Sequence, residues 1–568
     1  MPPPENIELL TRSGSSAALP EPDAFALSSS DDDDDDDSDS DSEYSYDSDA
    51  EARLLQRRRY AYTKKRPSAS TTRTCPWWVH WVSRLASART KPRSLRRSWP
   101  RYIARRSCQL LGFVVYSVLL VVVFNALLRP SYTPVQYPSS WHTLDESVRK
   151  GGGTNPPGYW KLLPGEHGVQ KATASGRGNP NNERVFIAAN IVNAELIEQE
   201  WGVRVMELMD MLGPENVFLS IFENDSGLET KKALHSLASR IKAHMPNAGQ
   251  SIVSTTLPFS GVPRVKIPGG GETYIKRITY LAEVRNRALL PLIGAIPSLA
   301  RWNQTGHPAS KTPTHEDIGD WVSHPSTYTR IVFLNDVVFS PHEVLHLLFS
   351  TNGGDYAAAC GIDYINPFKY YDTFATRDTD GFPLGIPFFP YFATAGPRDQ
   401  ILATSPEVAV ASCWGGVIAL NASYFLREKD PIRFRSEKEP YWDASECCLV
   451  HADIDEPTKT FINPFVRVAY DRTTFNWLPF VRHIERSFAL PHRILAWALG
   501  MPWPGLRRLE KQGERIEELQ WDGQKWVQVV RTAGKGGYCG SRKLLVMNEH
   551  PAPGERRWKN LPVPVPGV

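Results

Sequence analysis

The sequence predicts an α/β protein in which a mostly parallel, Rossmann-type sheet is flanked by helices and preceded by one transmembrane helix. From about residue 183 onward, short apolar runs alternate with stretches of helical period, which is the pattern of strands joined by crossover helices. A single uncharged apolar stretch at residues 108–128 is about long enough to cross a bilayer as a helix. Hydrophobic residues make up 41% of the 568 residues, so a large core can form.

Residues 1–107 are expected to form a disordered cytosolic tail. An unbroken acidic run at 31–37 is followed by a strongly basic block from 53 to 106, and such blocks offer no apolar surface to bury. The formal net charge of +3 hides this division. Membrane topology explains the basic block better than nucleic acid does, so no nucleic-acid partner is predicted. Five arginines lie between 96 and 106, whereas only Arg129 follows the apolar stretch closely, which keeps the N-terminus cytosolic.

The chain is therefore expected to be a single-pass type II membrane protein of the secretory pathway with its C-terminal part in the lumen. Residues 129–182 are rich in Pro, Gly and Ser and are expected to form a lumenal stem. A catalytic domain is expected at 183–545, followed by a C-terminal tail at 546–568. Five of the seven cysteines and three sequons, at Asn224, Asn303 and Asn421, follow the apolar stretch. An oxidising lumen permits disulfides, but the sequence does not give their pairing.

The order of elements within 183–545 follows from hydrophobic period and from helix-breaking residues. Gly213 and Pro214 end the first helix, and Pro341 opens a later one at a position that proline favours. The predicted strands are 184–192, 216–222, 251–256, 330–339 and 356–362, and the predicted helices are 195–212, 228–244, 274–292 and one beginning at 341.

Polar residues follow several of these strands, and ligands of such sheets bind at the C-terminal strand ends. Asp336 leaves the most apolar strand, where a carboxylate is costly unless it is paired or binds a metal. Oxygen ligands suit Mn2+ or Mg2+, so Asp336 is predicted to be a metal ligand. Asn190 lies near the end of the first strand, and Glu223 follows the second; both are predicted to contact the donor.

Two further groups carry candidate chemistry. Arg285 and Asn286 lie on the helix at 274–292, where a guanidinium can bind a phosphate. Asp443 and Glu446 are three residues apart, so on a helix they would share a face. They follow an aromatic pair and precede His451, which is a second candidate metal ligand.

The sequence resembles glycosyltransferase family 69, the fungal capsule-type α-1,3-mannosyltransferases. The resemblance covers roughly 183–545. The stretches that carry it are RVFIAANIVN (184–193), FENDSGLET (222–230), LAEVRNRALLPL (281–292), RIVFLNDVVF (330–339), AACGIDYINPFKYYDTFATRD (358–378), SCWGG (412–416), YWDASECCLVHADI (441–454) and GGYCGSRKLL (536–545).

The resemblance implies a GT-A-like fold, GDP-mannose as the donor, a divalent metal such as Mn2+, a glycan acceptor, an α-1,3 linkage formed with retention, and a Golgi location. Asn335-Asp336-Val337 stands where that fold class often has Asp-x-Asp, with an amide in place of the first carboxylate. Asp363, Asp443 and Glu446 are the candidates for catalytic work on the acceptor or the transition state.

Two alternatives stay open at this point. The same fold could serve a non-catalytic membrane protein that aids export or trafficking of cell-wall or capsule polysaccharide. It could also be an enzyme that uses another nucleotide sugar, such as one carrying xylose. The sequence does not choose between a carboxylate nucleophile and a front-face route.

Overall fold

A computed structural model describes residues 126–151, 175–255, 257–294, 328–502, 512–552 and 555–564, with scattered positions from 113 to 124 and residue 510. All of these belong to one compact unit, Ser98–Val568. The expected cytosolic tail, part of the predicted membrane span and the sequon at Asn303 lie outside the described residues. Within the described ranges, no helix combines the length and the apolar character that crossing a membrane requires.

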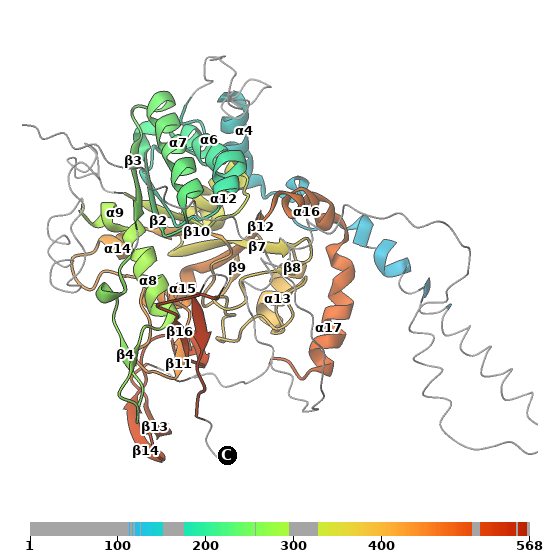
Figure 1. Cartoon of the computed structure of the whole chain (residues 1–568). Helices are drawn as coiled ribbons and strands as arrows, with labels where there is room; N and C mark the ends of the chain where they lie inside the picture. The colour runs from blue at the N-terminus through green and yellow to red at the C-terminus, as the bar shows by residue number, and fades with distance from the viewer. Residues whose placement is uncertain are drawn as a thin grey trace, which may run out of the picture. The chain divides into compact units, whose positions relative to one another are not determined.

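The core of the fold is a large, mostly parallel sheet, as the sequence predicts (Figure 1). Its strand order is β3-β2-β1-β6-β10-β7-β12-β9, and β8 pairs with β7. β10 runs antiparallel to both β6 and β7, so β7 and its parallel neighbour β12 point the same way as β1, β2, β3 and β6. The strands are β1 Val185–Ala189, β2 Val217–Asn224, β3 Gly249–Thr255, β6 Arg330–Leu334, β7 Ala358–Asn366, β8 Lys369–Tyr370, β9 Val408–Ala409, β10 Val417–Asn421 and β12 Thr460–Ala469.

Helices cover both faces of this sheet. Val185, Ile187 and Ala189 of β1 pack in a core with the first group of helices, whereas Phe186 and Ala188 point into a second core with the other group, because successive strand residues face opposite sides. The first group is α6 Gly202–Leu212, α7 Leu228–His244 and α12 Pro341–Phe349, and the second includes α8 Arg277–Ala288 and α15 Glu446–Ala452 (Figure 1).

The remaining elements extend this frame. The expected helix at 195–212 is divided by a π turn at Ile197–Trp201, and the expected helix at 274–292 is interrupted at Leu289, just before Pro291. The other helices are α4 His142–Gly151, α5 Ala194–Leu196, α9 Leu290–Gly294, α13 Ala395–Leu402, α14 Ser423–Leu426, α16 Arg472–Ile484 and α17 Ala489–Ala498.

The C-terminal part of the chain packs against the base of α8. The expected tail from 546 onward is partly folded here, since Met547 contributes to a small core with Ile275 and Tyr280. The strands outside the large sheet form pairs: β4 Val265–Lys266 with β5 Thr273–Tyr274, β11 Trp442–Ala444 with β15 Gly540–Arg542, β13 Arg515–Trp521 with β14 Trp526–Thr532, and β16 Leu545–Met547 with β17 Trp558–Asn560.

The described part of the expected stem is not a spacer, because residues 131–147 pack on the domain. Tyr132 and Trp141 are almost fully buried. The Tyr132 ring meets Phe465 edge-on with centroids 4.9 Å apart, and its hydroxyl donates to the Ile401 carbonyl at 3.1 Å. Trp141 stacks on His346 with ring centroids 4.6 Å apart. The apolar positions here are too few and too irregular to give a sequence period, which is why a stem was expected.

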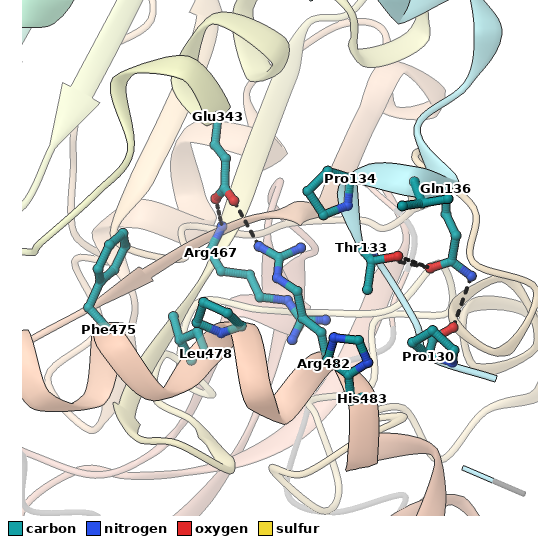
Figure 2. A pocket seen from close by; sticks show the side chains of 12 residues that line it. Pro130, Thr133, Pro134, Gln136, Glu343, Arg467, Phe475, Leu478, Arg482 and His483 are labelled. Atoms are coloured by element: carbon teal, nitrogen blue, oxygen red, sulfur yellow. Dashed lines mark hydrogen bonds and ion pairs between the residues drawn. The ribbon is translucent and has the colours of Figure 1, made fainter. Parts of the chain in front are cut away.

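A pocket of about 470 Å3 lies under this segment (Figure 2). Glu343 accepts hydrogen bonds from the Arg467 backbone N–H at 2.9 Å and from Arg482 at 2.8 Å. On the facing wall, Thr133 donates to the side chain of Gln136. None of the candidate site residues lines this pocket, so it belongs to the junction of the segment with the domain and not to the expected active site.

This packing predicts that Trp141→Ala destabilises the domain. Replacing a buried tryptophan with alanine costs about 3–5 kcal/mol, and Trp141 is 2% exposed. Thermal unfolding of the full chain measures the loss, with Trp497→Ala as the control because Trp497 is 82% exposed. For the same reason, a chain that begins at residue 180 should unfold at a lower temperature than one that begins at 129. Equal melting temperatures for both pairs would contradict the docking of residues 131–147.

Candidate functional site

The C-terminal end of β6 presents a carboxylate without a protein partner. Asp336 forms no hydrogen bond or ion pair with any other residue that the structure describes. Its surface is partly accessible, yet enough protein surrounds it that burial raises the pKa of its carboxyl group. Such a group is poised to take a cation, because a positive charge would offset the cost of its ionised form.

The side chain before Asp336 is already occupied. The Asn335 Oδ1 atom accepts a hydrogen bond from Trp414 Nε1 at 3.1 Å, and the Asn335 carbonyl accepts one from Trp201 Nε1 at 3.0 Å. Gly415 and Gly416 allow this close approach, since both have positive φ and a Cβ on Gly415 would lie 2.0 Å from the Gly361 carbonyl oxygen. Asn335 therefore acts as a structural residue that holds the Trp414 loop against the strand end.

Arg285, from α8, brings a guanidinium to the same place. The guanidinium carbon, Cζ, lies 4.6 Å from the centroid of the Trp414 ring, and Arg285 Nε donates a hydrogen bond to Glu446 Oε1 at 2.9 Å. The two Nη nitrogens have no partner among the described residues. Arg285 is close enough to lower the pKa of Asp336 through its charge, yet the two side chains do not form an ion pair. The free guanidinium end and the free carboxylate thus lie near each other at the sheet edge.

Glu446 orients Arg285 from the first turn of α15. Its carboxylate is buried, and the Cys447 thiol also lies 3.5 Å from the same oxygen. Burial raises the pKa of the Cys447 thiol well above its usual value, so the sulfur stays protonated. Glu446 is the charge partner that allows a guanidinium to be held in this partly desolvated place.

A second acidic group is formed by Asp363, in the C-terminal half of β7, and Asp372, in the loop after β8. Asp363 is fully buried, accepts the Asp372 backbone N–H at 3.0 Å and accepts the Tyr470 hydroxyl at 3.0 Å. Burial, and then the negative charge of Asp372, raise the pKa of Asp363 to about 7. Burial also raises the pKa of Asp372, with Glu446 adding to the shift and Arg285 opposing it. The pair holds a proton at a pH where exposed aspartates have none.

This raised pKa gives a testable pH dependence of stability. A carboxyl whose folded pKa is about 7 contributes stability that is fully present below its unfolded pKa of about 4 and is lost as the pH rises through 7. Asp363→Asn removes the ionisable group, so its melting temperature relative to wild type should rise from pH 4 to pH 7 and then level off. Asp399→Asn, on an exposed side chain, is the control. A difference that does not change with pH would contradict the raised pKa.

Asp443 and Glu446 are not on the same helix, contrary to the expectation of a shared helical face. Asp443 belongs to β11, whereas Glu446 begins α15. Burial raises the pKa of Asp443 to about 6, and the charges of Lys276 and Arg277 oppose the shift. Lys276 donates to three backbone carbonyls, including that of Trp442 at 2.5 Å. Asp443 is thus a buried neighbour of a structural lysine.

Three of the predicted donor-side residues have internal roles. Asn190 Nδ2 donates to the Phe222 carbonyl at 2.8 Å and so ties β1 to β2. The two carboxylate oxygens of Glu223 accept the hydroxyls of Ser226 and Ser254. The Asn286 amide exchanges both of its hydrogen bonds with the backbone of Phe434, at 2.8 and 3.0 Å. Of these three, only Asn190 keeps a polar atom, Oδ1, without a partner.

His451 lies beside a disulfide and not beside Asp336. Its Nε2 is 2.6 Å from the Cys413 carbonyl oxygen, and burial lowers the pKa of the ring to about 4. Cys360 and Cys413 are bonded to each other, so the cluster of these two sulfurs with His451 offers no thiolate to a metal. The second disulfide joins Cys448 to Cys539 and leaves Cys447 as the free thiol among these five cysteines.

The structure therefore gathers Asp336, Arg285, Glu446 and Asp363 around one edge of the sheet and adds Asp372, which the sequence analysis did not select. Asp372 lies in a loop after β8 without strand or helix period. The signal that could have found it is its position within the stretch 358–378 that carries the family resemblance. Tyr470, directly after β12, donates its hydroxyl hydrogen bond to Asp363.

A known protein family matches the part of the chain that contains this edge of the sheet. A family model described as Cryptococcal mannosyltransferase 1 matches residues 184–453, a range that contains the site. No curated protein sequence matches the chain.

Two solved structures superpose on the chain only loosely. Mannosyltransferase PcManGT from Pyrobaculum calidifontis, in complex with GDP-Man and Mn2+, does so with a TM-score of 0.27 and 12% identity over 67% of this chain and 75% of that one. A mycobacterial protein gives a TM-score of 0.24 and 11% identity over 62% of this chain and 84% of that one. Neither superposition is close enough to relate individual residues.

Proposed function

We propose that this chain is a mannosyltransferase that transfers mannose from GDP-mannose to a glycan acceptor. The family-model match over 184–453 supports a mannosyltransferase. The observation that carries the proposal is the proximity of two charged groups at the C-terminal edge of the sheet. Among the described residues, Asp336 has an unpaired carboxylate, and Arg285 has two unpaired Nη nitrogens and lies close enough for its charge to act on Asp336. That edge is where α/β proteins of this kind bind nucleotides, and a nucleotide diphosphate needs both a cation and a positive side chain.

The residues present fit a divalent cation, Mn2+ or Mg2+. Asp336 is the protein ligand that we assign to the cation, because Asn335 Oδ1 is engaged by Trp414 and His451 Nε2 lies against the Cys413 carbonyl. Ions of this type are commonly held by one or two carboxylates together with substrate phosphates and water. When bound, the cation would neutralise charge on the leaving diphosphate.

The other residues then take distinct roles. The free Nη atoms of Arg285 bind a phosphate oxygen, and Glu446 together with the Trp414 ring holds the guanidinium in place. Asp372 is the partly exposed carboxyl of the acidic pair, and it faces the acceptor or the reacting sugar while Asp363 stores the shared proton. Asp443 supports this group from β11. An α-1,3 linkage and retention are proposed from the family resemblance.

The membrane topology remains part of the proposal. A type II arrangement with the domain in the Golgi lumen predicts that Asn421, at the end of β10, or Asn303 carries a glycan. The Asn224 side chain is engaged by Leu257 N–H at 2.7 Å and by Tyr280, so this sequon should stay unmodified. Gel mobility before and after endoglycosidase checks the prediction. Unchanged mobility, with the domain open to protease in sealed microsomes, would contradict lumenal placement.

The test of function is a donor screen on the full-length protein. GDP-mannose, other GDP-sugars and UDP-sugars including UDP-xylose are compared for hydrolysis and for transfer, with and without Mn2+. We expect cation-dependent turnover of GDP-mannose above that of the other donors. Preference for a UDP-sugar would overturn the donor assignment, and absence of turnover with every donor would favour a non-catalytic role in polysaccharide export.

A further inference from the structure

Three metal-binding side chains meet where the N-terminal segment docks on the domain, away from the proposed active site. His342 and His346 lie on α12, and Asp145 lies on α4. The Nε2 atoms of both histidines are 2.8 Å from the same Asp145 oxygen, Oδ1. His346 is 1% exposed, whereas His342 and Asp145 are 33% and 27% exposed, so solvent can reach the cluster from one side.

We propose that Asp145, His342 and His346 form a binding site for Zn2+ or a similar first-row transition-metal ion. The proposal is independent of the proposed glycosyl transfer. Imidazole nitrogens with one carboxylate oxygen are a donor set that such ions prefer.

The geometry matches this donor set. Histidines at positions i and i+4 of a helix project from one face, and the third ligand arrives from a different element. The three ligand atoms all lie within 4.8 Å of one another. Ligands of a tetrahedral zinc ion at about 2.0–2.1 Å lie roughly 3.3 Å apart, so a small outward shift of Asp145 would admit the ion. His142 is not one of the three ligands, because its Nδ1 lies 4.0 Å from the other Asp145 oxygen, Oδ2.

The surroundings of His346 fix the direction of its ring. Its Nδ1 lies 2.9 Å from the Ser350 hydroxyl, and Trp141 stacks on one face of the ring. Metal-binding histidines use their second nitrogen in this way, since the outer hydrogen bond fixes the tautomer and the ring orientation. With an ion bound, Nδ1–H would donate to the Ser350 hydroxyl, and the Nε2 lone pair would point at the ion in place of the present Nε2 contact with Asp145.

A metal ion at this site would cross-link the N-terminal segment, residues 131–147, to the rest of the domain. α4 follows Trp141 directly, and α12 begins five residues after Asp336. A bound ion would therefore join α4, in the segment that follows the predicted membrane span, to α12, the helix that follows β6 and Asp336.

Zinc binding by the full-length protein tests the proposal. The protein is stripped with a chelator and titrated with Zn2+ against a chromophoric competitor, and Co2+ is added separately as a visible-absorption probe of a tetrahedral site. The variants are His342→Ala and Asp145→Asn, on partly exposed residues, and Ser350→Ala. His235→Ala, on the exposed side of α7, is the matched control, and Asp336→Asn removes the separate cation ligand of the sheet edge.

We expect His342→Ala and Asp145→Asn to lose about one equivalent of bound Zn2+ and the tetrahedral Co2+ spectrum. Ser350→Ala should weaken binding by about 10–100-fold. Zn2+ should raise the melting temperature of wild type, His235→Ala and Asp336→Asn but not that of the two ligand variants. Equal zinc content in wild type, His342→Ala and Asp145→Asn would overturn the proposal, whereas loss of zinc only in Asp336→Asn would assign it to the sheet edge.

Discussion

Asp336→Asn should reduce transfer from GDP-mannose at least about 10–100-fold and shift the Mn2+ dependence to higher concentration. Changes to residues that merely support a metal ligand already cost about this much, and Asp336 is the one free carboxylate at the end of β6. The amide keeps the size of the side chain and replaces a carboxyl group whose ionised form is disfavoured by burial. The fold should therefore survive. The transfer rate is measured against Mn2+ concentration, and excess Mn2+ should restore part of it.

The contrasting variant is Glu446→Gln. Glu446 contacts Arg285 and not the cation position, so its amide should lower turnover without moving the Mn2+ curve. Asp399→Asn, on an exposed side chain, controls for loss of a surface charge. A wild-type rate and a wild-type Mn2+ curve for Asp336→Asn would exclude this residue as the metal ligand.

Local pattern predicted the framework well. α7 has the bounds expected from its apolar spacing, Leu228–His244, because Gly227 and the residues after His244 leave no helical continuation. β6 ends earlier than the expected 339, at Leu334, since the Asn335 backbone turns toward Gly416 and its side chain toward Trp414. The polar pair Asn335-Asp336 already indicated this end, but its partners lie about 80 residues away in the sequence, so no local signal could have identified them.

Strand direction was beyond the sequence. The residues of β10, VIALN, have the apolar pattern of a parallel strand buried on both faces, yet β10 runs antiparallel between β6 and β7. Hydrophobic runs carry no information on direction. The insertion matters because it separates Asp336 from Asp363 by one strand while keeping both at the same edge of the sheet.

The sequence correctly identified site residues where the fold leaves a charged side chain with atoms that have no hydrogen-bond partner among the described residues. Asp336 and Arg285 were selected for charge at a strand end and on a facing helix, and both have free polar atoms in the structure. Glu223 and Asn286 were selected by the same reasoning, but each is satisfied by neighbours in the fold. Sequence shows where polar residues occur and not which of them the fold has already paired.

The final prediction concerns Arg285, whose guanidinium is proposed to bind the donor phosphate. Arg285→Lys keeps the positive charge but loses the planar group that lies over Trp414 and the fixed Nε contact to Glu446. Hydrogen bonds to charged groups contribute about 1.5–3 kcal/mol, which corresponds to roughly a 10–150-fold loss of affinity. We therefore expect GDP to bind that much more weakly, with a similar loss in transfer rate.

Arg287→Lys is the matched control for this experiment, because Arg287 lies on the same helix and pairs with Glu283 at 2.9 Å, one turn away. It should leave GDP affinity unchanged. Arg285→Gln should be worse than Arg285→Lys in both affinity and stability, since it leaves the buried Glu446 carboxylate without a positive partner. GDP binding by calorimetry and thermal unfolding measure the two effects separately. Equal GDP affinity for Arg285→Lys and Arg287→Lys would contradict a phosphate contact at Arg285, even if both variants were less stable than wild type.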